Sequence, residues 1–372
     1  SSVGVNKASN REELIAALNE AIKHDIPILV EEAIVGREIE CAVLGVYAPE
    51  ASDVGEVLSA EDFYTFDAKY NNQESRTDLH PVFPEGKLEE VRADAVKIFK
   101  ALDGFGCARV DFFMEKDLYF QNVYGVSAGA CHLCSYISRQ PKRAYHVSLD
   151  YLKDKNYCSM RSLLTTGDLF NVKMCYDTIP NKLLPYDYKE AARYEGNAYA
   201  VVTNLETGKA EYLPMKEMHK DIINVRASAS LPLVSRIVSI DGKPYLDGGI
   251  ADPIPIRHAI KDGNAKNIVI LTKETDYVRK PAPSAQLEMI RLRYTNYPKL
   301  YELMADRHNA YNDTLRFIEG QKAHGRAFVI RPKEANDIGR IEKDRKKLEK
   351  LYELGYKDAK ACYEDMMKFL NA

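Results

Sequence analysis

The sequence predicts an α/β protein, with a helical region at its C-terminal end. Strand-like apolar runs alternate with amphipathic, helix-like stretches over the first three quarters of the chain. The run NIVILT at 267–272 is continuously apolar, which is typical of a strand buried in a parallel sheet. From about residue 284 onward, long charged stretches with helical spacing dominate. Together these observations favour mixed sheets covered by helices.

The first 113 residues predict a partial α+β segment. A helix is expected over 10–24, where Asn10 is placed as the N-cap and Glu13 stands at the capping-box position. A second amphipathic helix is expected over 85–102, and a polar, aromatic loop over 61–80. Three runs have strand composition: 27–34, 38–46 and 107–113.

The middle of the chain predicts a strand, a tight turn and a helix that ends near Arg139. Residues 145–190 are rich in Tyr, Asp and Leu, and we expect an irregular region that covers a substrate. A small-residue helix is expected to begin at 226 and run to 237. The other elements expected are a hairpin over 198–213, strands at 243–246, 267–272 and 326–330, and long helices after 284.

Composition narrows the class of protein. The 372 residues are 45% apolar and 29% charged, and they contain no membrane-length apolar run, so a cytoplasmic protein is expected. Seven cysteines, an odd number, indicate reduced thiols, and Cys131 and Cys134 are expected on a buried helix face. Because the chain starts in a loop without Met, we expect a fragment or a processed product.

Charge is unevenly distributed along the chain. Residues 1–117 hold 12 Lys+Arg against 24 Asp+Glu, a net charge of −12, and the remainder holds 40 against 31, a net charge of +9. The basic part suits contact with an anionic membrane surface, although ordinary solvated faces would give the same count. No nucleic-acid-binding motif is present, and the sequence does not predict an oligomeric state.

The stretch Gly125-Val-Ser127-Ala-Gly129 matches a nucleophile elbow. A serine on a sharp turn from strand to helix needs small neighbours, and strand-like NVYGV precedes it while helix-like ACHLCSYI follows. The helix N-terminus would add partial positive charge beside the serine. Taken alone, GxSxG is equally compatible with a plain Gly/Ser turn.

A second motif, Asp247-Gly-Gly-Ile-Ala-Asp-Pro, lies 120 residues downstream of Ser127. Taken alone it is an ordinary turn. The order GVSAGA, ASASLPLV and DGGIADPIPI resembles the patatin-like phospholipases over roughly 118–275, and the helical tail around 307–312 resembles bacterial members of that family. The resemblance implies a three-layer α/β/α domain, placed at 114–283, followed by a helical region at 284–372. It also implies hydrolysis of lipid acyl esters by Ser127 as nucleophile and Asp247 as base, with no cofactor.

One part of the family pattern is missing. Patatin-like phospholipases carry a glycine-rich oxyanion loop on a strand before the elbow, and the nearest stretch here, Leu102-Asp-Gly-Phe-Gly106, matches it poorly. Loss of one oxyanion donor costs on the order of 10²–10³ in rate. We therefore expect an impaired hydrolase.

Residues 1–113 resemble a different family, the D-alanine–D-alanine ligases of the ATP-grasp fold. The matching stretches are SSVGV, LVEEAIVGREIECAVLG, DFYTFDAKY and CARVDFF. The resemblance implies an ATP and Mg²⁺ site, with Asp111 as a metal ligand. The residues implied for nucleotide and phosphate contacts are Ser1, Ser2, Glu31, Glu38, Lys69, Tyr70 and Arg109.

The ligase-like part is incomplete as well. Where that family completes its metal site with a further acidic residue and an asparagine, this chain reads Tyr119-Phe-Gln-Asn-Val-Tyr124, without a carboxylate. We expect no ligation of D-alanine, and a junction between the two patterns within 107–118. Three hypotheses remain: a patatin-like hydrolase, which we favour, an ATP-dependent D-alanine–D-alanine ligase, and a non-catalytic chimera of the two.

Overall fold

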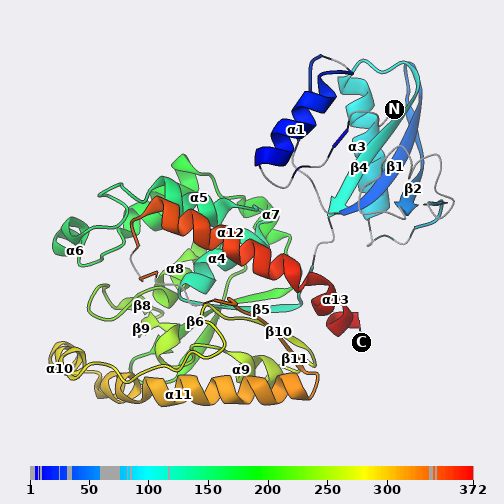
Figure 1. Cartoon of the computed structure of the whole chain (residues 1–372). Coiled ribbons are helices and arrows are strands. Elements are labelled where there is room, and N and C mark those ends of the chain that lie inside the picture. The colour runs from blue at the N-terminus through cyan, green and yellow to red at the C-terminus, as the bar shows by residue number, and fades with distance from the viewer. Residues whose placement is uncertain are drawn as a thin grey trace. The chain divides into compact units, whose positions relative to one another are not determined.

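The chain folds into two compact units, Ser1–Leu118 (unit 1) and Tyr119–Ala372 (unit 2) (Figure 1). The computed structural model describes residues 5, 6, 8, 11–24, 26–31, 36–58, 76–81, 83, 86–115, 118–334, 338–339 and 342–371. Among the described residues, no helix is both long and apolar enough to cross a membrane.

Unit 1 contains an antiparallel sheet of strand order β3-β2-β1-β4. Its described elements are α1 (Arg11–Ala21), β1 (Gly36–Gly45), β2 (Glu50–Leu58), β3 (Arg76–Asp78), α3 (Lys87–Ala101) and β4 (Gly106–Glu115). The predicted helices and the strands at 38–46 and 107–113 are confirmed. The strand expected at 27–34 is wrong for its described residues, because 27–31 pair with no described strand and Leu29 remains 81% exposed.

The core of unit 1 lies between one face of this sheet and α3. Ile39, Cys41 and Val43 alternate along β1 and point inward, and they pack with Phe99 and other apolar side chains of α3. The residues between them on β1 face away from α3, together with the residues opposite them on β4. Arg109 therefore stands on the open face of the sheet.

Unit 2 is built around a second sheet, in which β6 is central. Its strands are β5 (Asn122–Val126), β6 (Asn197–Asn204), β7 (Ala210–Pro214), β8 (Val238–Ile240) and β9 (Lys243–Asp247). A separate parallel pair is formed by β10 (Asn267–Ile270) and β11 (Ala327–Ile330). β5 runs parallel to β6, while β7 and β9 run antiparallel to it.

Helices cover the sheet of unit 2 on both faces (Figure 1). They are α4 (Ala128–Ile137), α5 (Arg143–Asp150), α6 (Met160–Thr166), the π-helix η1 (Met174–Leu183), α7 (Tyr188–Ala192), α8 (Met218–Ser228), η2 (Gly248–Ile250), α9 (Ile256–Lys261), α10 (Ser284–Arg293), α11 (Pro298–Ala323), α12 (Arg345–Ala361) and α13 (Tyr363–Asn371). One core packs α4 and α8 against β6, and a second core packs α10 and α11 near β9. The α/β class and the helical C-terminal region are confirmed.

Three local expectations for unit 2 were wrong. Residues 145–190 form short helices rather than an irregular region, and two of these begin at side-chain caps, Ser159 and Asp187. The helix expected at 226–237 is in fact the end of α8, which stops at Ser228, ahead of a segment in which Leu233 has a φ of 72°. Cys131 is exposed rather than buried.

Candidate functional site

Ser127 occupies the junction between β5 and α4. Its backbone has φ 55° and ψ −121°, a strained conformation for a residue with a Cβ. A Cβ on Gly125 would lie 2.5 Å from the Cα of Ala130, so the turn is tight enough to require glycine there. Ser127 is also the N-cap of α4, and the dipole of that helix favours negative charge that develops next to its first turn.

The elbow is held from the side by α8. The backbone N–H of Ser127 donates to Oγ of Ser228 at 3.0 Å, and Ser228 is fully buried. The carbonyl of Ser127 accepts the N–H of Ala130 at 3.0 Å as the first turn of α4 closes. The position of Ser127 is thus fixed by elements that are separate in sequence.

Asp247 reaches the same place by strand pairing. β5 pairs with β6 up to Val126↔Val201, and β9 pairs with β6 from Val202↔Asp247. Because β7 pairs with residues on both sides of this point, it occupies the opposite edge of β6, so β5 and β9 share one edge. Their carboxyl ends therefore face each other at consecutive residues of β6. The structure brings the loop of Ser127 and the carboxylate of Asp247 together.

The carboxylate of Asp247 is 1% exposed and held by its own loop. Its Oδ1 accepts the N–H of Gly249 at 2.7 Å, and its backbone N–H donates to the carbonyl of Ser230 at 2.8 Å. A Cβ on Gly248 would overlap the carbonyl oxygen of Val201, which explains the first glycine of the DGG motif. The side chain of Asp247 is therefore rigidly oriented.

Arg307 of α11 is a site residue that the sequence reasoning missed. Its Nε donates to the carbonyl of Gly249 at 2.6 Å. A Cβ on Gly249 would lie 3.0 Å from Oδ1 of Asp247 and 3.1 Å from Nη2 of Arg307, so the guanidinium stands beside the carboxylate. A nearby cation favours the ionised carboxylate. In the sequence, Arg307 stands out only as part of the stretch 307–312, which resembles bacterial patatin-like phospholipases. No local pattern links it to Asp247.

Cys131 lies one turn into α4 from Ser127, and its thiol senses the charge of Asp247. Water reaches this residue, yet enough protein surrounds the thiol that desolvation, followed by the negative charge of Asp247, raises its pKa to about 11. The same thiol contributes to raising the pKa of Tyr157, where desolvation is again the largest cause. The thiol of Cys131 therefore lies near enough to Asp247 for the charge of that carboxylate to act on it.

The raised pKa predicts slow alkylation of Cys131 by iodoacetamide at pH 7. Only the thiolate reacts, and an ordinary cysteine has a pKa of about 8.5, so its thiolate fraction at pH 7 is roughly 300-fold larger than that of Cys131. The rate at Cys131, followed by peptide mass spectrometry, should rise about tenfold per pH unit up to pH 10. The variant Asp247→Asn should react faster at every pH below 10, because one cause of the raised pKa is removed. A rate that levels off near pH 9 would contradict this account.

The residues implied for a ligase site are only partly described. Ser1, Ser2, Lys69 and Tyr70 lie outside the described residues, and Glu31 is exposed in a segment without strand structure. Glu38 lies opposite Phe113 in the β1–β4 pairing, on the face that also carries Arg109 and Asp111. The structure thus groups Glu38, Arg109 and Asp111 on one sheet face.

The Asp111 carboxylate is engaged by Arg109 on both oxygens, at 2.7 and 2.9 Å, and Arg109 also forms an ion pair with Glu40 at 2.9 Å. Mg²⁺ prefers carboxylate oxygens that are directly available. This arrangement does not fit a bound Mg²⁺. No group of three His, Cys, Asp or Glu residues suited to a metal ion occurs in the part of the chain that the structure describes.

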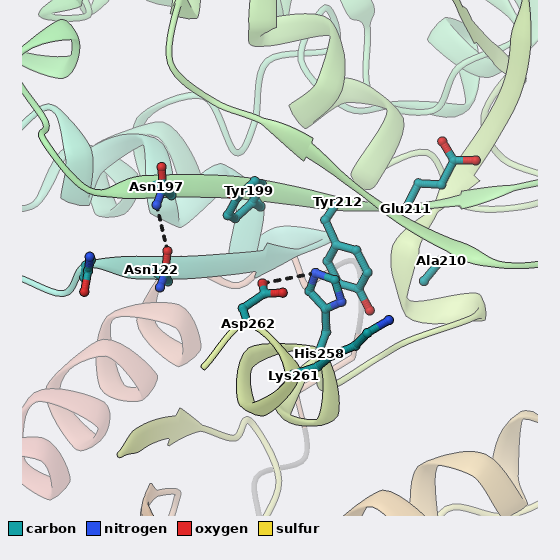
Figure 2. A pocket seen from close by; sticks show the side chains of 10 residues that line it. Asn122, Asn197, Tyr199, Ala210, Glu211, Tyr212, His258, Lys261 and Asp262 are labelled. Atoms are coloured by element: carbon teal, nitrogen blue, oxygen red, sulfur yellow. Dashed lines mark hydrogen bonds and ion pairs between the residues drawn. The ribbon is translucent and has the colours of Figure 1, made fainter. Parts of the chain in front are cut away.

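A polar pocket of about 830 Å³ lies at the amino-terminal ends of β5 and β6, away from Ser127 (Figure 2). Asn122 and Asn197 hydrogen-bond at 2.9 Å on one wall. On the other wall the His258 ring stacks on Tyr212 with centroids 3.4 Å apart, and its Nε2 lies 3.2 Å from Asp262. The sequence predicted no role for these residues. Their contacts with one another give them a structural role in the walls of the pocket.

Comparison with known families finds three matches along the chain. Residues 98–260 match the family model described as patatin-like phospholipase, and residues 1–124 match the D-ala D-ala ligase C-terminus. Residues 297–371 match a domain of unknown function, DUF6363. The chain is therefore a mixed α/β protein that carries a patatin domain. Its N-terminal segment is an ATP-grasp-like piece of the D-alanine–D-alanine ligase type, and the two matches overlap over 98–124.

Two curated relatives match the N-terminal third of the chain. D-alanine–D-alanine ligase of Ruminiclostridium cellulolyticum is 54% identical over 119 residues, which is 32% of each chain. The Clostridium novyi ligase is 50% identical over 117 residues, 32% of this chain and 34% of the relative. This chain thus spans about a third of the length of these relatives. Among solved structures, VanG D-Ala:D-Ser ligase from Enterococcus faecalis is 34% identical, with a TM-score of 0.28, over 31% of this chain and 34% of that one.

Proposed function

We propose that unit 2 is a patatin-like serine acyl hydrolase that acts on lipid esters through a Ser127–Asp247 dyad. The observation that supports the proposal is that β5 and β9 meet end to end on one edge of β6. The strained backbone of Ser127 follows one of these strands, and the buried Asp247 ends the other. The patatin match over 98–260 supports the same reading.

In this mechanism Oγ of Ser127 attacks the ester carbonyl carbon, and the Asp247 carboxylate takes the hydroxyl proton. The alcohol leaves with that proton, and a water then attacks the acyl-serine while Asp247 takes one of its protons. The bond between the acyl carbon and Oγ breaks, the carboxylic acid leaves, and Asp247 returns the proton to Oγ of Ser127. Arg307 acts as a positioning residue, because its Nε donates to the carbonyl of Gly249 and so holds the loop that follows Asp247.

The oxyanion that develops on the carbonyl needs hydrogen-bond donors. The first N–H groups of a helix have no partner within that helix, so the first turn of α4, from Ala128, can supply donors next to Ser127. The glycine-rich loop that the family adds is not found in the sequence. A hydrolase that has only part of its oxyanion hole should turn over slowly. Each missing donor should lower kcat by a factor on the order of 10²–10³.

A fluorophosphonate probe tests the proposal directly. It should label Ser127 covalently, because the reagent reports an activated serine and needs only one chemical step. The label, located by peptide mass spectrometry, should disappear in Ser127→Ala and persist in Ser148→Ala, which removes an exposed hydroxyl on α5.

The D-alanine–D-alanine ligase reading is the second candidate, because the N-terminal third is about half identical to such ligases. It is disfavoured by the engagement of Asp111 with Arg109. Phosphate release from ATP on addition of D-alanine, without serine labelling, would reverse this order. Neither reaction would favour a non-catalytic chimera.

A further inference from the structure

Two helices of unit 2 present apolar side chains to solvent. On α6, Met160 and Leu164 are 63% and 82% exposed, and their spacing of four residues places them on one helix face. On α10, Met289 and Leu292 are 53% and 70% exposed, at a spacing of three. We call these four residues the apolar rim. Pairs of exposed apolar side chains on one helix face mark an interaction surface more often than scattered single ones do.

Hydrogen bonds connect both parts of the apolar rim to one loop that leads from the candidate active site. On one side, the segment after α6 is tied to residues 233–236, since Leu169 donates its N–H to the carbonyl of Val234 at 2.9 Å and Asp168 accepts from Arg236 at 2.7 Å. On the other side, the end of α10 is tied to the same loop, because Leu233 donates its N–H to the Tyr294 hydroxyl at 2.9 Å. Residues 233–236 therefore connect the two helices.

That loop begins at the dyad. Three residues before Leu233, the carbonyl of Ser230 accepts the N–H of Asp247. The inner face of α10 packs in one cluster with Leu246, the residue before Asp247. In Figure 1, α6 and α10 both lie at the left edge of unit 2, with β8 and β9 between them. The rim is thus linked to Asp247 through the loop that follows Ser230 and through the packing of α10 on Leu246.

The charges beside the rim identify the occupant. The sequence of α6, MRSLLTT, contains Arg161 and no acidic residue, and on α10 Glu288 pairs with Arg291 at 2.7 Å, which leaves Arg293. Arg161 and Arg293 are exposed and form no ion pair with any described residue. Apolar side chains interleaved with unpaired cations suit the interface of an anionic bilayer. A second copy docked through the same face would instead set these arginines against one another.

We propose that unit 2 docks on the surface of an anionic phospholipid bilayer through the apolar rim, with Arg161 and Arg293 at the lipid head groups, so that the dyad faces the membrane. This inference rests on the proposed function for the identity of the substrate, but the binding itself requires no chemistry. The four rim side chains would be buried at the boundary between head groups and acyl chains.

Vesicle flotation of the full chain in the Ser127→Ala background tests the docking without lipid turnover. Vesicles of phosphatidylglycerol and phosphatidylcholine should carry the protein, and the double change Leu164→Gln/Leu292→Gln should lower the partition coefficient at least tenfold, since two buried side chains are lost from the interface. Ile270→Gln is the matched control, because Ile270 is 73% exposed on β10, outside the rim. Arg161→Gln/Arg293→Gln should weaken binding to anionic vesicles more than to purely zwitterionic ones.

Unchanged flotation of the leucine double variant, or an equal loss in Ile270→Gln, overturns the proposal. The proposal is also overturned if the Ser127→Ala chain does not float with the vesicles. It fails as well if the rim variants change only the sedimentation of the protein, from dimer to monomer. The same rim variants, made in the chain that keeps Ser127, are also assayed for hydrolysis of a soluble p-nitrophenyl ester. This assay separates the docking proposal from the proposed function. Docking without any esterase activity would refute the proposed function alone, and esterase activity with rim-independent flotation would refute the docking alone.

Discussion

Ser127→Ala should abolish hydrolysis of short p-nitrophenyl esters while unit 2 remains folded. The side chain of Ser127 is the attacking group, and its replacement removes only one oxygen at a position whose backbone is held by Ser228 and by the first turn of α4. Loss of a nucleophile costs on the order of 10³ or more in kcat. The rate of nitrophenolate release is the measurement, with far-ultraviolet circular dichroism as the check on folding.

Asp247→Asn makes this test sharper. The asparagine oxygen can still accept the N–H of Gly249, so the loop geometry should survive while the base is lost. If serine and carboxylate act as one unit, the double variant should be no slower than the slower of the two single variants, because the effects of groups that act together do not add. Ser148→Ala should retain full activity. Additive losses, or residual activity unchanged from wild type in Ser127→Ala, would remove the dyad from the mechanism.

Local patterns predicted the elbow from the sequence because its causes are local. Glycine at 125, a serine and small residues after it are required within six positions, and a strand before and a helix after complete the pattern. The motif around Asp247 was equally visible. No local pattern could predict that β5 and β9 meet on one edge of β6. That arrangement depends on the pairing of β6 with β5, about 75 residues away in sequence, and with β9, about 45 residues away.

The failures have physical causes too. The apolar run at 27–34 has strand composition, yet a strand needs a partner and its described residues have none. The expectation of an irregular region at 145–190 overlooked caps, although Ser159 and Asp187 each bind an N–H three residues ahead. Arg307 was missed because its contact with the loop of Gly249 spans 58 residues and carries no sequence signature.

Gly248→Ala should destabilise unit 2 severely. Gly248 is buried, and its new methyl group would overlap the carbonyl oxygen and carbon of Val201 on β6, which are backbone atoms and cannot rotate away. Overpacking a well-packed interior costs about 1–3 kcal/mol and occasionally more, and a clash with the central strand belongs at or above the upper end. Urea denaturation followed by circular dichroism should show a clear fall in the midpoint of the unit 2 transition.

The matched control is Gly320→Ala in α11, where a Cβ would meet no atom within 4 Å. That change should stabilise the helix by about 0.5–1 kcal/mol, because alanine loses less backbone entropy than glycine. The two substitutions add the same methyl group with opposite expected signs, so a general intolerance of the chain to mutation cannot produce the pattern. A Gly248→Ala protein as stable as wild type would mean that the loop after Asp247 is not in close contact with Val201 of β6. That contact would then no longer support the placement of Asp247 near Ser127.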